Sequence, residues 1–165
     1  MEQLLVTSLR PAELLIGKTI PYLMISLVAT AIILLAARIL FGVAVRGSYF
    51  DLFVATLVYL IGALGWGLLV SSMSKSQAMA FQVGSLTSML PAIFLSGFIF
   101  PIRSMPHVLQ VLTYAVPARY FLVISRGIIL KGAPLNAFLG DLGFLFLYGV
   151  VVLAFAWRRL AKTEH

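Results

Sequence analysis

The chain has 165 residues, of which 62% are hydrophobic and only 10% charged, and its mean hydropathy is +1.09. Soluble domains average about 25% charged residues, so this composition predicts an integral membrane protein with little room for a soluble domain. The formal net charge of +7 would suggest a nucleic-acid partner in a soluble protein, but here basic residues at membrane–water boundaries account for it. Cysteine is absent, which excludes disulfides and thiolate metal sites.

The N-terminal stretch, residues 1–18, places leucines between polar residues, as an interfacial amphipathic helix does. Pro11 suits a first helical position, and Glu13 then lies in the first turn, where the helix dipole favours an acid. A simple lead-in to a span is the alternative. Residues 12–19 match a loosened phosphate-loop pattern, with Ala12 for the first glycine, but no strand precedes them and their composition favours a helix. We therefore expect no nucleotide binding there.

Four apolar runs predict four membrane-spanning helices, each near the roughly 20 residues that a span needs. They cover residues 20–40, 51–70, 77–100 and 138–157. The second contains Gly62, Ala63, Gly65 and Gly67, small residues that let a neighbouring helix approach closely. Lysine and arginine are equally frequent on the two sides of this arrangement, so charge alone does not decide its orientation.

The third predicted span carries a small residue at every fourth position. This helix-packing stripe consists of Ala80, Gly84, Ser88, Ala92 and Ser96. Small residues at this spacing favour close contact with another helix in lipid, and a face that lines a substrate path is the second interpretation. Pro91 lies within the span and predicts a kink.

The segment 101–132 is apolar but interrupted by Pro101, Pro106 and Pro117, each of which breaks a helix. The pieces between them, residues 107–116 and 118–130, are too short to span a membrane. They predict short re-entrant or interfacial helices, with a capped surface loop as the alternative. We expect their apolar side chains to pack against the spans. These are Val108, Leu109, Val111, Leu112, Leu122, Ile124 and Ile128.

The ionisable residues indicate neither an active site nor proton coupling. The acids are Glu2, Glu13, Asp51, Asp141 and Glu164, and none falls in the middle of a predicted span. Ion-coupled transporters usually carry an ionisable residue within the membrane, so that class is disfavoured.

Two further side chains have candidate roles as ligands. His107 has no acid or cysteine near it in sequence and is interpreted as a surface residue rather than a metal ligand. Arg119 could meet an anionic substrate, but contact with a lipid headgroup or the interface is the favoured interpretation.

Two stretches resemble the ABC-2 type permeases, the membrane subunits of ATP-driven exporters. GFIFPIRSMPHVLQVLTYAVPARYFL, residues 97–122, followed by SRGIILKG, looks like the family segment that forms short extracytoplasmic helices between the last two spans. EQLLVTSLRPAELLIGKTIPY, residues 2–22, is similar to the cytoplasmic coupling-helix region that docks on the ATPase subunit. The resemblance runs from Glu2 to about Lys162 but corresponds only to the C-terminal part of a family permease.

The resemblance implies a permease subunit without enzymatic activity, metal or cofactor of its own, since ATP and Mg²⁺ would bind the partner ATPase. It implies an ATP-binding subunit and a second permease subunit as partners, in a homo- or heterodimer, and a multi-pass place in a bacterial inner membrane with both termini cytoplasmic. Drug-like or other small molecules are the expected substrates. The alternatives are an ion-coupled small multidrug-type transporter and a truncated, non-functional permease fragment.

The same resemblance assigns two sets of residues. The ATPase-docking region would contain Leu5, Arg10, Pro11 and Glu13. An extracytoplasmic lid over the substrate path would contain Gly97, Pro101, Pro106, Pro117 and Arg119.

Overall fold

The computed structural model describes residues 11–163, and within that range all regular secondary structure is helical, as predicted. The α-helices are α1 (Pro11–Phe41), α2 (Tyr49–Met73), α3 (Gln77–Gly84), α4 (Leu90–Phe94), α5 (His107–Thr113), α6 (Pro117–Lys131) and α7 (Leu139–Thr163). A π-helix, η2 (Ser85–Met89), joins α3 to α4, and two 3₁₀ turns, η3 (Ile102–Ser104) and η4 (Leu135–Phe138), precede α5 and α7.

Helix α1 is continuous from Pro11 to Phe41, and its stretch Thr19–Phe41, which is long and apolar enough to cross a membrane, agrees with the first predicted span. At 1.5 Å per residue it is about 46 Å long, more than the roughly 30 Å of a bilayer core. Pro21 lies inside it, and membrane helices tolerate such a break in the hydrogen-bond ladder. Leu5 and Arg10 of the predicted docking region lie outside the described residues.

Helices α2 and α7 form the centre of the bundle, where glycines bring their backbones together. A Cβ atom added at Gly62 would lie 3.1 Å from Cδ1 of Tyr148, and one added at Gly65 would lie 3.1 Å from Cδ2 of Leu153. The small residues of the second span therefore do provide the close helix contact that the sequence predicts.

The buried core lies where α2, α6 and α7 meet. Its fully buried side chains are Leu52, Ala55, Ile124, Ile128 and Leu145. Most other large apolar side chains are exposed, including much of α1. A helix that is apolar on all sides and exposed is suited to hydrocarbon rather than water.

At one end of the bundle, backbone groups of the α1–α2 loop bond to the end of α6. The N–H groups of Arg46 and Gly47 donate to the carbonyl oxygens of Ile129 and Ile128, at 3.1 and 3.0 Å. Close by, the N–H of Leu135 donates to Oδ2 of Asp51 at 3.0 Å. Asp51, expected only to suit a helix N-terminus, thus also holds the α6–α7 connection against α2.

Three helical stretches are long and apolar enough to cross a membrane within the described part of the chain. They are Thr19–Phe41, Tyr49–Met73 and Leu135–Arg159. The third predicted span, residues 77–100, is not among them, because its helix ends at Phe94 and is divided by η2. The π-helix η2 ends at Met89, two residues before Pro91, where the sequence predicts a kink.

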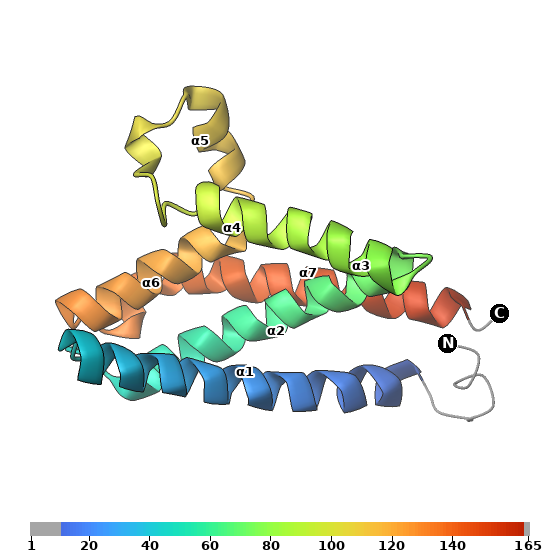
Figure 1. Ribbon diagram of the computed structural model, residues 1–165, viewed down its shortest axis with the longest axis horizontal. Coiled ribbons are helices and arrows are strands. Elements are labelled where there is room, and N and C mark those ends of the chain that lie inside the picture. Colours follow the sequence, from blue (N-terminus) through green and yellow to red (C-terminus); the bar gives the residue numbers. More distant parts are fainter. Residues whose placement is uncertain (1–10, 164–165) are drawn as a thin grey trace.

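The segment after α4 breaks at the three prolines. Pro101 precedes η3, Pro106 precedes α5, and Pro117 is the first residue of α6. The axes of α5 and α6 differ by 78°, and α5 projects away from the other helices, as Figure 1 shows.

The two halves of this bent pair differ in burial. Ile124 and Ile128 of α6 are fully buried, as expected. Val108 and Val111 of α5 are 74% and 68% exposed, and Leu109 and Leu112 are also exposed. The expectation that α5 packs against the spans is therefore wrong. Two helical turns projecting beside a bundle lack the length to fold back onto it.

Candidate functional site

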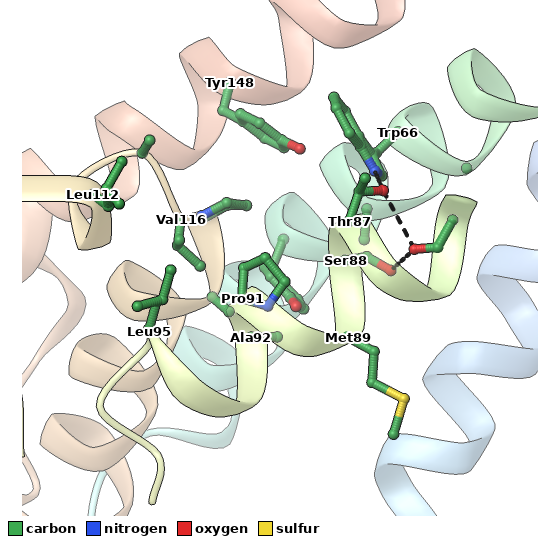
Figure 2. A pocket seen from close by; sticks show the side chains of 17 residues that line it. Trp66, Thr87, Ser88, Met89, Pro91, Ala92, Leu95, Leu112, Val116 and Tyr148 are labelled. Atoms are coloured by element: carbon green, nitrogen blue, oxygen red, sulfur yellow. Dashed lines mark hydrogen bonds between the residues drawn. The ribbon is translucent and has the colours of Figure 1, made fainter. Parts of the chain in front are cut away.

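A cavity of about 580 Å³ lies between α2, the α3–η2–α4 stretch and the turn that joins α5 to α6. Figure 2 shows its lining seen from close by. The lining residues are Tyr59, Ala63, Trp66, Gly67, Gly84, Thr87, Ser88, Met89, Pro91, Ala92, Leu95, Leu112, Ala115, Val116, Pro117, Ala118 and Tyr148.

Small residues leave the space that this cavity occupies. Gly84, Ser88 and Ala92, three members of the helix-packing stripe, line it from one side, and Ala63 and Gly67 of α2 line it from the other. A Cβ added at Gly84 would lie 3.9 Å from Cγ1 of Val70, which is ordinary contact. Gly84 thus approaches Val70 of α2 and, together with Ser88 and Ala92, also lines the cavity.

The remaining members of the stripe lie outside the cavity lining. Ala80 is half-buried in α3, and Ser96 is buried just beyond α4, with its hydroxyl donating to the carbonyl of Ala92.

The π-helix η2 places two hydroxyl groups in the cavity lining. Thr87 Oγ1 donates to the carbonyl of Val83 at 2.7 Å, and Ser88 Oγ donates to that of Gly84 at 2.6 Å. Pro91 has no N–H to offer the carbonyl of Thr87, four residues earlier, so the regular ladder must change there. Such single π turns are frequent at functional sites.

A hydrogen bond between two elements crosses the cavity lining. Trp66 of α2 donates its indole Nε1–H to Oγ1 of Thr87 at 3.2 Å, as drawn in Figure 2. Sequence reasoning missed this pair. The available signal was a tryptophan inside an apolar span, where its N–H needs a partner.

The chemistry of the cavity is apolar with few polar groups. Tyr59, Trp66 and Tyr148 supply aromatic surface, and Tyr59 also stacks on Phe121 with ring centroids 4.5 Å apart. None of the described residues that line the cavity is charged. Mainly apolar walls with a few placed hydroxyl groups are typical of sites for drug-sized molecules.

The predicted lid residues fall in different places. Pro117 lines the cavity described above, whereas Gly97, Pro101 and Arg119 line a second cavity of about 660 Å³. Pro106 precedes α5. Of the predicted docking residues, Pro11 and Glu13 belong to the first described turns of α1, and the phosphate-loop match is entirely helical.

The fold and the cavity are those of a multi-pass membrane protein. The chain belongs to the ABC-2 family, because residues 1–158 match the family described as "ABC-2 family transporter protein". Permease subunits of ABC transporters have no catalytic activity of their own, and within residues 11–163 no group of three or more His, Asp or Glu side chains could hold a metal ion.

Named relatives agree with this assignment. The probable multidrug ABC transporter permease YbhS of Escherichia coli is 38% identical over 162 residues, which cover 98% of this chain and 43% of that protein. The probable multidrug ABC transporter permease YbhR, also of Escherichia coli, is 35% identical over 136 residues, which cover 82% of this chain and 37% of that protein. The linearmycin resistance permease protein LnrN of Bacillus subtilis is 24% identical over 158 residues, covering 96% and 40%. The chain thus spans about two fifths of the length of these relatives, and no solved structure matches it.

Proposed function

We propose that the chain forms part of the permease of an ATP-driven exporter and that its 580 Å³ cavity holds a drug-like or other small molecule during export. The observation that carries this proposal is an uncharged, aromatic cavity inside a chain of the ABC-2 family. The names of YbhS and YbhR as probable multidrug permeases support the substrate class. ATP is hydrolysed in a separate subunit, and a second permease chain completes the path.

In this proposal four helical stretches cross an inner membrane: α1, α2, α3–η2–α4 and α7. The bent pair α5–α6 stays at the extracytoplasmic side as a re-entrant lid, because neither piece reaches the roughly 20 residues of a span. The first described turn of α1 and the end of α7 lie at the same end of the bundle in Figure 1. That end is cytoplasmic in the proposed arrangement.

Cysteine labelling tests this topology, since the native chain contains no cysteine. Cysteines introduced at Ser104 and at the exposed Asn136 should react with a membrane-impermeant thiol reagent added outside intact cells. A cysteine at the exposed Lys75, between α2 and α3, should react only after the cells are opened. Labelling of Lys75→Cys alone in intact cells would show that the orientation is reversed.

We further propose that the ATPase subunit docks on residues 1–18, including Leu5, Arg10, Pro11 and Glu13. Because α1 continues from this region without a break, a movement at the docking end passes directly into the span. The turn between α2 and α3 lies at the same end of the bundle, which gives the docking surface a second candidate element (Figure 1).

Charge reversal in the docking region tests the assignment of function. In the complete transporter, the double variant Arg10→Glu with Glu13→Lys should retain less ATPase subunit on purification and lose substrate-stimulated ATP hydrolysis. Lys131→Glu reverses an exposed charge at the opposite end of the bundle and is the matched control. Unchanged assembly and unchanged stimulation in the double variant would remove residues 1–18 from the interface.

A further inference from the structure

The second cavity, of about 660 Å³, brings three arginines together. Arg103 comes from η3, while Arg119 and Arg126 lie two turns apart on α6. No acidic residue is among the described residues that line this cavity. Asp141 of the neighbouring helix α7 is not part of the lining, but its carboxylate interacts electrostatically with Arg119, which leaves Arg103 and Arg126 as the arginines of this cavity without a nearby acid in the described range.

Two of the arginines are held by neutral partners. Arg119 donates to the hydroxyl of Thr113, a fully buried side chain, and its guanidinium lies 4.0 Å from the centre of the Tyr114 ring. Arg126 donates to the carbonyl of Gly97 at 3.2 Å. Neither bond removes positive charge, so both guanidinium groups remain cations with donors to spare.

Arg103 makes no hydrogen bond or ion pair with any other residue of the described range 11–163, and its side chain is exposed. A guanidinium group stays protonated in proteins, so the cavity cannot relieve its charge by losing a proton. Like charges around one space repel, and the repulsion grows as the surroundings become less polar. A bound anion would offset it.

The segment that connects two of the residues lining this cavity is apolar and aromatic, and we call it the rim. Phe98, Ile99 and Phe100 connect Gly97 to Pro101, both of which line the cavity, and each of the three side chains is more than half exposed. Tyr114, beneath Arg119, is also exposed. Basic groups beside exposed aromatic side chains are typical of the membrane headgroup region.

We propose that this arginine cavity binds the phosphate group of an anionic phospholipid, with the acyl chains along Phe98, Ile99 and Phe100. Phosphate is the group that guanidinium donors match best, because two N–H groups can bond two oxygens at once. The apolar rim favours a lipid over a free phosphate, which would gain nothing from exposed phenylalanines. The inference does not depend on what the protein exports.

Lipid binding to the full chain in neutral detergent tests the proposal. Binding of phosphatidylglycerol and of phosphatidylcholine with the same acyl chains is counted by native mass spectrometry, with soluble glycerol phosphate as a third ligand. We expect the chain to prefer phosphatidylglycerol by about tenfold or more. The double variant Arg103→Gln with Arg126→Gln should lose this preference. The variant Lys75→Gln with Lys131→Gln, which removes two exposed charges elsewhere, should keep it.

Two further variants guard against a folding defect. Arg103→Gln alone removes no internal hydrogen bond and should still weaken phosphatidylglycerol binding. Arg103→Lys keeps the charge but not the two-point geometry and should recover part of the preference. Equal binding of both lipids by the native chain, or equal loss in the lysine-to-glutamine control, would overturn the proposal. Arginine-dependent binding of glycerol phosphate as tight as that of phosphatidylglycerol would overturn the assignment to lipid.

Discussion

Replacing Gly127 with alanine is expected to force α6 away from Phe138 of η4 and to destabilise the protein. A Cβ atom at Gly127 would lie 2.1 Å from Cζ of Phe138 and 2.7 Å from Cε2, distances that no pair of carbon atoms can share. The helix cannot rotate away, because its neighbours Ile124 and Ile128 are fully buried on the same face. Overpacking of this kind costs about 1–3 kcal/mol or more. Thermal unfolding in detergent should show a lower Tm.

Gly143→Ala is the matched control, since Gly143 is also helical and nothing lies within 4 Å of its added Cβ. Alanine there should be neutral or stabilising, by up to about 1 kcal/mol. A second-site change, Phe138→Leu, should restore much of the stability of the Gly127→Ala variant by removing the ring that it meets. A Gly127→Ala protein as stable as the native chain would show that Gly127 of α6 and Phe138 of η4 are not in the contact described.

Filling the 580 Å³ cavity is expected to abolish export while leaving the protein assembled. Gly67 lines the cavity, and nothing lies within 4 Å of an added Cβ. In the complete transporter, Gly67→Phe should place a ring in the space proposed for the substrate and reduce export by tenfold or more. ATPase subunit binding should persist, because the change falls neither in residues 1–18 nor in the turn between α2 and α3. ATP-dependent uptake of a fluorescent drug-like compound into inverted membrane vesicles, where an exporter pumps inward, provides the measurement.

Gly143→Phe adds the same ring to α7 at a position with open space outside this cavity, and export should continue in that variant. Both proteins are compared at equal membrane abundance. Normal export by Gly67→Phe would separate the cavity from the transport path. Loss of export by both variants would show that a large side chain on either helix disturbs transport, whether or not it fills the cavity.

A helix-breaking substitution at Ile124, such as Ile124→Pro, would not test the lid alone. Ile124 is fully buried between α2, α6 and α7, so proline there would disrupt the core as well as the lid. The lid itself is better tested at the α5–α6 turn, where Leu112 and Val116 line the cavity.

The features that sequence reasoning predicted correctly depend on local covalent chemistry. Proline lacks an N–H and has a fixed φ, and the helices after α4 begin where Pro101, Pro106 and Pro117 predict. The close contact of α2 with α7 followed from glycines that leave the backbone uncovered. Neither inference required knowledge of which other helix lies beside these residues.

The features that were missed depend on partners distant in sequence. Trp66 of α2 donates a hydrogen bond to Thr87 of the π-helix η2, and no local sequence pattern specifies that pair. The arginine cavity draws its residues from η3 and from two turns of α6, so the sequence did not indicate that Arg103 lies beside Arg119 and Arg126. The exposed face of α5 could not be predicted because its apolar spacing is the same whether it meets protein or lipid.

The two hydrogen bonds from the α1–α2 loop to α6 have a mechanical consequence. Arg46 and Gly47 lie in the α1–α2 loop, four residues beyond the end of α1, and the carbonyls of Ile129 and Ile128 that accept their N–H groups belong to α6. The other end of α6 begins at Pro117, which borders the uncharged cavity. A piston-like displacement of α1 along its axis that residues 42–45 do not absorb would either break both bonds or move α6 as well. In the second case the wall of the cavity shifts with the far end of the first helix.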